Sequence, residues 1–390
     1  MEIIEAFRLY FNTFPTVIAR APGRVNLLGE HVDYNDGLVL PAAIDRQVNI
    51  AACETRDNTI TIVALDLGRK ISFRLSDLKS RTDVNGHLLE GWELYPAGVA
   101  WSLRQAGFKI SGIKAAFSSN IPIGSGLSSS AAVEVGFAVL WKLLGGWEIP
   151  PLQLAQLCQL AENKYVGVSC GLMDQFASAC GVAGHALCFD VRSLDWEPAP
   201  LPAGTSLVIA DSGVRRSLAN SAYNARRASC EQAVEELRRY LPKIQSLRDV
   251  KPTEFAAYSQ YLSEEPRLRA EHIVKEIARV QSAFQALKRN DRQAFGALMY
   301  AGHASLKTLY QVSTPELDAL VEISRQIQGS LGARLTGAGF GGCTINLVEE
   351  QYTSQFAKQL QEGYRISTGK QAQVYVCHAS QGACAEGYPQ

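Results

Sequence analysis

A short segment near the N-terminus gathers side chains that could bind a ligand rich in hydroxyl groups. Glu30, His31 and Asp33 supply several hydrogen-bond acceptors and one imidazole within four residues. Each sugar hydroxyl is both a donor and an acceptor, so such a cluster suits a polyhydroxylated ligand. The Asn-Asp-Gly sequence at 35–37 is also a common turn signal. Two strands with solvated charges between them are therefore the alternative interpretation.

A second segment, IPIGSGLSSSAAVEV at 121–135, joins glycines and serines to an apolar helical pattern. It lacks the lysine of a Walker A loop, and Ser129 stands where a dinucleotide fingerprint has its third glycine. Glycines let the backbone turn its N–H groups to one side, and a helix N-terminus adds about half a positive charge. The segment therefore predicts either an anion site without a lysine or a helix cap with additional serines.

A third segment, RLTGAGFGGCTINL at 334–347, has four glycines within six positions, flanked by apolar residues. Glycine permits tight turns and close approach of the backbone to a ligand. The segment by itself fits either a hairpin or a ligand-binding loop.

The elements that must position these segments alternate between strands and helices in the first half of the chain. Strand patterns cover 16–29, 48–55, 59–65, 113–122, 185–193 and 205–213, and helix patterns cover 91–107 and 150–167. From Ser217 to about Leu287 the pattern is helical and rich in charge, and a helix at 352–364 and a strand at 371–379 follow. Three prolines in EPAPLPAG predict a domain boundary near residue 200, which gives domains 1–200 and 201–390.

Composition limits the classes of function that this chain can have. Its 390 residues are 47% hydrophobic and 19% charged, a globular balance with enough material for two domains. Lys plus Arg and Asp plus Glu both total 38, so no overall basic field is available for nucleic acid or an anionic membrane. Nine cysteines without a CxxC pair favour reduced thiols. With neither a signal peptide nor a membrane span in view, we expect a cytoplasmic protein. The sequence does not fix the oligomeric state, and a monomer is expected.

Taken together and in this order, the three segments resemble the motifs of the GHMP small-molecule kinases. GRVNLLGEHVDYNDGLVLPAAI resembles the signature of the galactokinases within that family, and AENKYVGVSCGLMDQFAS, SAYNARR and VSTPELD support the resemblance. It implies a two-domain α+β fold, with an N-terminal domain like ribosomal protein S5 domain 2 and a ferredoxin-like C-terminal domain. It also implies an active site between the domains, where the γ-phosphoryl of ATP passes to the C1 hydroxyl of α-D-galactose.

The resemblance also implies roles for individual residues. Asp174 in GLMDQ matches the catalytic aspartate, and Arg24 matches the arginine beside the reacting hydroxyl. The implied sugar contacts are Glu30, His31, Val32, Asp33, Gly171 and Tyr223. The implied ATP phosphate loop consists of Gly124, Ser125, Gly126, Leu127, Ser128, Ser129 and Ser130. The implied Mg²⁺ ligands are Ser130 and Glu162, with Ser129 close enough to compete with Ser130.

These roles agree with what phosphoryl transfer requires of a protein. The reaction needs positioning and stabilisation of charge more than covalent chemistry. A carboxylate at Asp174 can accept the proton of the sugar hydroxyl, and Arg24 nearby would keep that carboxylate ionised. Mg²⁺ prefers hard oxygen ligands and keeps several waters, so one serine and one glutamate suffice.

Three positions depart from the usual family pattern, and none removes a proposed catalytic group. Ala338 replaces a glycine, Val32 stands where threonine is common, and Thr314 replaces a cysteine. The alternatives are a related kinase acting on N-acetylgalactosamine, galacturonate or L-arabinose, or a galactose-sensing regulator without activity. The intact run from Ser128 to Ala131, together with Asp174, favours an enzyme.

Overall fold

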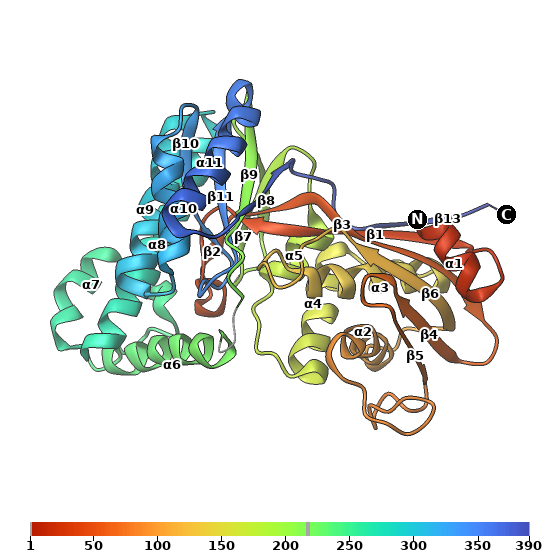
Figure 1. Ribbon diagram of the computed structural model, residues 1–390. Helices are drawn as coiled ribbons and strands as arrows, with labels where there is room; N and C mark the ends of the chain where they lie inside the picture. The colour runs from red at the N-terminus through yellow and green to blue at the C-terminus, as the bar shows by residue number, and fades with distance from the viewer. Residues whose placement is uncertain (1, 216–218, 390) are drawn as a thin grey trace.

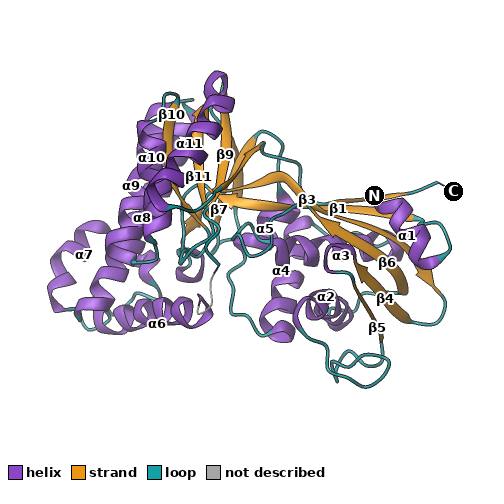
Figure 2. Cartoon of the chain, viewed as in Figure 1, coloured by secondary structure: helices purple, strands orange, loops and turns teal. Residues whose placement is uncertain are grey.

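The computed structural model describes residues 2–215 and 219–389, which form two units lying side by side (Figure 1). Each unit is built on a β-sheet covered by helices, as the colouring by secondary structure makes plain (Figure 2). Ser217, where the sequence pattern turns helical, lies outside the described residues.

The first unit is a six-stranded sheet in the order β13-β1-β3-β6-β4-β5, antiparallel except for the β4–β6 pair. Its strands are β1 (Val17–Asn26), β3 (Pro41–Thr55), β4 (Thr59–Ala64), β5 (Arg69–Arg74), β6 (Gly112–Ser119) and β13 (Cys384–Gly387). The accompanying helices are α1 (Ile3–Phe11), α2 (Leu94–Gln105), α3 (Ser129–Gly145), α4 (Pro151–Ala161) and α5 (Met173–Cys180).

The middle strands of this sheet are buried on both faces, because helices cover the two sides to which their successive side chains point. On β1, Ile18 packs with Phe7 of α1, whereas its neighbours Val17 and Ala19 join the large core beneath α3. The middle strands are therefore apolar on both sides, with α1 on one face and α3 on the other. This packing fixes where the N-terminus of α3 meets the end of β1.

The second unit is an antiparallel four-stranded sheet in the order β10-β11-β9-β12. Its strands are β9 (Thr205–Asp211), β10 (Ser330–Thr336), β11 (Cys343–Glu349) and β12 (Gln373–Cys377). Its helices are α6 (Ala219–Leu237), α7 (Pro252–Tyr258), α8 (Glu264–Lys288), α9 (Arg292–Ser305), α10 (Pro315–Gln326) and α11 (Thr353–Thr368). Helices separate β9 from β10 and β11 from β12, so the chain order is that of the expected ferredoxin-like topology.

A small third sheet lies where the two units meet. It contains β2 (Leu38–Val39), β7 (His185–Asp190) and β8 (Trp196–Pro200) in that order, and it contacts β3 on one side and α8 on the other. The proline-rich stretch near residue 200 therefore contributes β8, an edge strand, which is where proline is tolerated. Since β13 also returns to the first sheet, the boundary near residue 200 stays a prediction.

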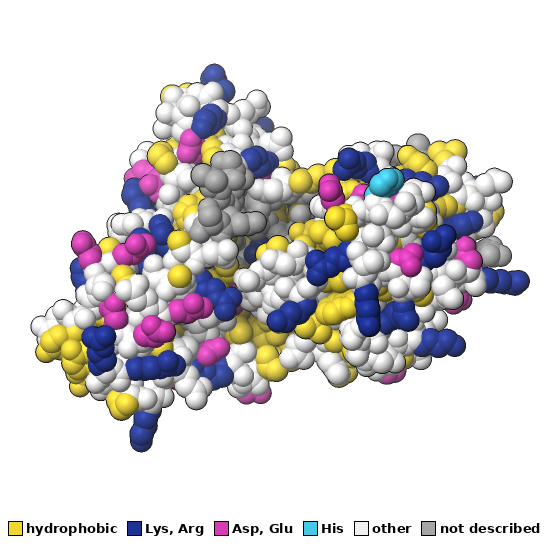
Figure 3. Space-filling model, turned by 90° about the horizontal axis from the view of Figure 1, so that it is seen from below, with side chains coloured by type: hydrophobic (Ala, Val, Ile, Leu, Met, Phe, Trp, Pro, Cys, Tyr) yellow, Lys and Arg dark blue, Asp and Glu magenta, His cyan; other side chains and the backbone are white. Residues whose placement is uncertain are grey.

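The surface and the thiols add little specialised chemistry. On the face shown in Figure 3, acidic and basic side chains are mixed over the lobe that carries α6 and α7. None of the helices in 2–215 and 219–389 is long and apolar enough to cross a membrane. No disulfide joins the cysteines of the described chain.

Candidate active site

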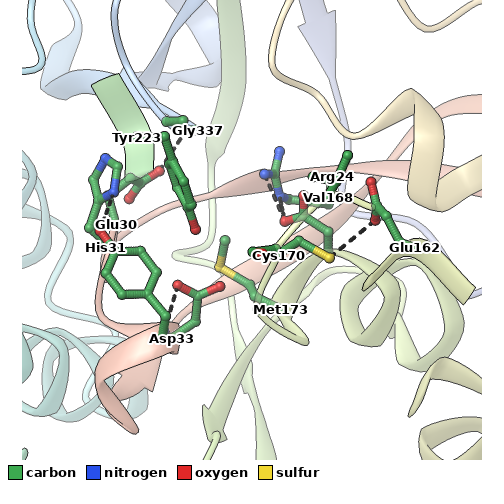
Figure 4. A pocket seen from close by; sticks show the side chains of 15 residues that line it. Arg24, Glu30, His31, Asp33, Glu162, Val168, Cys170, Met173, Tyr223 and Gly337 are labelled. Atoms are coloured by element: carbon green, nitrogen blue, oxygen red, sulfur yellow. Dashed lines mark hydrogen bonds and ion pairs between the residues drawn. The ribbon is translucent and has the colours of Figure 1, made fainter. Parts of the chain in front are cut away.

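A cavity of about 200 Å³ opens between the two units (Figure 4). It brings together eight residues that the sequence selected: Arg24, Glu30, His31, Asp33, Glu162, Gly171, Asp174 and Tyr223. Seven further lining residues were not selected: Tyr34, Val168, Ser169, Cys170, Met173, Gly337 and Ala338. Three of these seven, Tyr34, Cys170 and Met173, adjoin a selected residue in the chain, so proximity along the sequence was the available signal for them. Gly337 and Ala338 belong to the third glycine-rich segment.

Asp174 is held at the cavity by two neighbours that leave its carboxylate facing the lining residues. Arg24 lies beside Oδ1, with both Nε and the terminal Nη2 at 2.8 Å, and the hydroxyl of Ser128 donates to Oδ2 at 2.7 Å. Arg24 is almost fully buried, so this charge pair is only weakly screened by water. The expected pairing of Asp174 with Arg24 is confirmed.

The glycine- and serine-rich loop packs directly against β1. The guanidinium of Arg24 donates to the carbonyl of Gly126 at 2.6 Å, and its backbone N–H donates to the carbonyl of Leu127 at 3.1 Å. A Cβ on Gly23 would lie 2.7 Å from that same Leu127 oxygen, which is why the approach needs glycine. The loop therefore rests against the arginine that holds Asp174.

Ser128 precedes α3 in an unusual conformation. Its φ of 59° lies in the left-handed region, and its side chain does not cap the helix. The hydroxyl of Ser128 donates to Asp174 and accepts no hydrogen bond from the backbone of α3. The alternative prediction of a helix cap with additional serines is therefore wrong for Ser128. The first turn of α3 thus presents uncapped N–H groups, which favour an anion.

The third glycine-rich segment meets this loop from the other unit. A Cβ on Gly337 would lie 2.9 Å from the carbonyl oxygen of Gly126. Gly337, Gly339, Gly341 and Gly342 all have positive φ, whereas Ala338 does not. An alanine therefore fits at 338 without backbone strain. The segment forms the β10–β11 hairpin, which confirms the first interpretation. Gly337 and Ala338 also line the cavity, and ligand binding by this loop stays a prediction.

Asp33 and Gly171 form one wall of the cavity. A Cβ on Gly171 would lie 1.9 Å from Oδ2 of Asp33, so no larger residue fits there without displacing the carboxylate. Burial, together with the nearby charge of Asp174, raises the pKa of Asp33 to about 6. In Figure 4, Asp33 and Tyr223 lie on the same side of the cavity and face Arg24.

Glu30 is fixed by partners from both units. The backbone N–H of Gly337 donates to Oε1 at 2.8 Å, Asn26 donates to Oε2 at 2.8 Å, and Arg334 forms an ion pair at 2.6 Å. Burial raises the pKa of Glu30 to about 7, against the opposing effect of Arg334. Glu30 therefore links the first and third motifs as well as lining the cavity.

His31 lies in the left-handed region, with a φ of 64°, and is surrounded by tyrosines. Its Nδ1 is 2.8 Å from the hydroxyl of Tyr34, which is 2.7 Å from the hydroxyl of Tyr310. The imidazole centroid lies 5.6 Å from that of Tyr223. These contacts fix the ring orientation at the cavity wall.

Val32 differs from its selected neighbours. Its side chain is fully buried in the core beneath this loop, where a Cβ on Gly37 would come within 2.8 Å of it. The Val32 side chain packs into the core, whereas the residues on either side of it, His31 and Asp33, line the cavity. A side-chain contact from Val32 to the sugar is therefore not supported.

Glu162 and Ser130 offer the oxygen donors that Mg²⁺ prefers. Glu162 begins a π-helical segment, Glu162–Val166, at the end of α4, and such segments are frequent at functional sites. Burial, followed by the charge of Asp174, raises the pKa of Glu162 to about 7, and hydrogen bonding from Ser130 opposes this shift. No group of three His, Cys, Asp or Glu side chains in the described chain could hold a metal by itself. A cation here would therefore need ligands from phosphate and water.

Arg215, which the sequence reasoning missed, adds a cation beside the glycine- and serine-rich loop. It pairs through both terminal nitrogens with buried Asp211, at 2.7 and 2.8 Å. Its Cδ would lie 3.3 Å from a Cβ on Gly124. The sequence did not indicate that Arg215 lies near Gly124, because Arg215 follows β9 in the second unit and Gly124 precedes α3 in the first.

The comparisons with known proteins agree with this geometry. Residues 5–54 match the galactokinase galactose-binding signature, 95–182 the N-terminal domain of GHMP kinases and 283–366 their C-terminal domain. A galactokinase of Roseiflexus sp. (strain RS-1) is 44% identical over 98% of this chain and 96% of its own length. The chain belongs to the galactokinase family. As a member, it is an ATP-dependent sugar kinase with the two-domain α+β fold that the sequence predicted.

Other relatives support the family assignment. The galactokinase of Bacillus subtilis (strain 168) is 39% identical over 93% of both chains. The crystal structure of Lactococcus lactis galactokinase complexed with galactose superposes with a TM-score of 0.91, at 35% identity over 97% of this chain and 98% of that one. Methanococcus jannaschii mevalonate kinase, at 22% identity and a TM-score of 0.68, shares the fold and covers 94% of this chain and 99% of its own.

Proposed function

We propose that this enzyme transfers the γ-phosphoryl of ATP to the C1 hydroxyl of α-D-galactose, giving galactose 1-phosphate and ADP. The observation that carries the proposal is the ion pair of buried Arg24 with Asp174, which joins the cavity to the glycine- and serine-rich loop. A solved relative with 35% identity holds galactose, and its fold extends over nearly the whole of this chain.

The acceptor sugar would occupy the cavity against Asp33, His31 and Tyr223, with Gly171 keeping the wall open. These groups supply the acceptors and donors that several hydroxyls need. The small volume of the cavity suits one monosaccharide.

Asp174 would accept the proton of the attacking hydroxyl as the bond to phosphorus forms. Arg24 and Ser128 hold its two oxygens in place, so the carboxylate is oriented before the sugar arrives. Arg24 also lies where it can stabilise charge on the transferred group, because it contacts the loop at Gly126.

ATP would bind with its phosphates over Gly124–Ser130 at the N-terminus of α3. Ser130 and Glu162 would hold Mg²⁺, since their oxygen donors fit the ion and phosphate completes the coordination. When bound there, the ion would supply positive charge that offsets the negative charge of the phosphates during transfer.

The test is the variant Asp174→Asn, which keeps the shape and removes the proton acceptor. We expect kcat to fall by about 100-fold or more, while the galactose Kd measured by calorimetry changes little. Near-normal kcat would contradict the assigned role. A panel of sugars with ATP checks the substrate: turnover of N-acetylgalactosamine, galacturonate or L-arabinose without galactose would overturn the choice of galactose.

A further inference from the structure

The side chain of Gln175 spans two buried carboxyl groups beside the active site. Its amide nitrogen donates to Oε2 of Glu162 at 2.5 Å and to Oε2 of Glu134 at 2.9 Å. Gln175 is fully buried and follows Asp174 directly on α5, so one turn of this helix carries both residues. Of the two ends of the amide, only the NH₂ group can serve two carboxylate acceptors at once.

Glu134 is a buried acidic residue that the mechanism leaves without a role. It lies on α3 in the turn after Ser130, its exposure is 0%, and its carboxyl makes no ion pair with any residue in the described ranges. Its Oε1 also lacks a hydrogen-bond partner there. A buried carboxyl is costly unless it is hydrogen-bonded, so the bond that Glu134 accepts from Gln175 needs an explanation.

We propose that Gln175 is a positioning residue, anchored by Glu134, that fixes the carboxylate of Glu162 for the divalent cation. The proposal rests on the proposed function, in which Glu162 holds Mg²⁺. The bond to Glu134 on helix α3 orients the Gln175 amide, so that its nitrogen also donates to Glu162. Glu162 then presents a defined oxygen towards the cavity that it lines. Groups that hydrogen-bond a metal-ligating carboxylate commonly contribute about 10–100-fold to metal affinity.

Other contacts of Glu162 cannot replace this anchor. The thiol of Cys170 donates to the same Oε2 at 3.3 Å, but thiols are weak donors. Gln175 comes from α5 and Glu134 from α3, two helices that pack together, so the anchor is as rigid as the core. Glu162 itself lies in a π-helical turn, whose backbone is less regular, and a bond from a rigid neighbour compensates for that.

The experiment measures cation binding directly. Mn²⁺ is titrated into the full-length enzyme with galactose and a non-hydrolysable ATP analogue, and free Mn²⁺ is followed by electron paramagnetic resonance against an enzyme-free control. Gln175→Met keeps the side-chain volume without either donor. Gln175→Asn is too short to reach both carboxyls. Ser178→Ala is the matched control, because it removes a buried hydrogen bond, 2.7 Å to the Pro22 carbonyl, from the same helix.

We expect Gln175→Met to lower the affinity for Mn²⁺ by about 10-fold or more, and Gln175→Asn to lower it by a smaller factor. The Kd for galactose should stay within about twofold of the wild-type value in both variants. Unchanged Mn²⁺ affinity in Gln175→Met overturns the inference, and so does an equal loss in Ser178→Ala. If Gln175→Met does not fold, unchanged affinity in Gln175→Asn overturns it instead. Glu162→Gln separates the two proposals: if it leaves Mn²⁺ affinity intact, the assignment of the metal to Glu162 fails.

Discussion

At the scale of single residues, Gly171 decides how close the cavity wall can come to the sugar. Gly171→Ala would place a methyl group within 1.9 Å of Oδ2 of Asp33, although the backbone there needs no positive φ. We expect the KM for galactose to rise by about 10- to 100-fold, because small displacements of binding groups are costly. The KM for ATP should change little. Steady-state kinetics with each substrate varied separately measures both.

A suitable control for this change is Gly387→Ala, where a Cβ would meet open space and the backbone is likewise not left-handed. It should leave both KM values unaltered. A galactose KM that does not change in Gly171→Ala would show that Asp33 can move freely, contrary to its tight packing in the structure.

The raised pKa of Asp33 also makes a prediction about stability. Its pKa rises from 3.8 to about 6 on folding, through burial and the charge of Asp174, so the folded state binds the proton more tightly. The stability that it contributes is therefore present in full below about pH 4 and is lost as the pH rises through about 6. Asp33→Asn should remove at most about 3 kcal/mol of that pH dependence. Urea unfolding of the wild type and Asp33→Asn at pH 4.5 and pH 7 measures the free energy of unfolding of each. If this free energy changes equally with pH in the two proteins, the raised pKa of Asp33 is contradicted.

At the scale of elements, the entry into α3 is shaped by the bond from Ser128 to Asp174. Ser128→Ala and Ser128→Gly both lose this bond, so both should lower kcat at saturating ATP by about 10-fold or more. They should differ in stability, because only glycine adopts a φ of 59° without strain. We expect the glycine variant to be about 1 kcal/mol more stable than the alanine variant. Kinetics and urea unfolding test the two effects separately, and wild-type kcat in both would refute the positioning role.

The strand and helix patterns explain why local structure was largely predictable. Strands β1, β3, β4, β6, β7, β9 and β12 and helices α2, α4, α8 and α11 fall where the residue patterns predicted them. The proline-rich stretch was interpreted as a boundary, but part of it pairs with β7 as an edge strand. Pairing of that kind depends on the partner strand, which a local pattern does not contain.

At the scale of the whole molecule, Arg334 joins the two units through a buried ionic cluster. From β10 it contacts Glu30 at 2.6 Å, Glu276 of α8 at 3.2 Å and the carbonyl of Leu27 at 3.1 Å. Arg334→Met would leave Glu30 and Glu276 without this partner, so we expect a loss of about 3–5 kcal/mol. Adding Glu30→Gln should restore part of it, because Glu276 keeps its ion pair with Arg279 whereas Glu30 loses its only ion-pair partner in the described chain. Urea unfolding of the single and double variants measures this, and no loss in the single variant would show that the cluster is dispensable.

The sequence by itself determined the motifs and most of the local structure. Residue types and spacing predicted a cluster for a polyhydroxylated ligand at Glu30, His31 and Asp33, and left the glycine- and serine-rich loop open between an anion site and a helix cap. The prediction of a sugar kinase came from the resemblance of these motifs, taken in order, to those of the galactokinases. These features are local, and their chemistry follows from residue type and order.

Only the tertiary structure decided which distant residues complete the site. Arg334, Arg215 and the Glu134–Gln175 anchor act across elements far apart in the chain. Glu134 is the clearest case, because in sequence it is only a charge that interrupts an apolar helix, whereas in the fold it supports the Gln175 amide beside Glu162. Burial and hydrogen-bond partners arise when helices and sheets pack, so no local pattern could assign them.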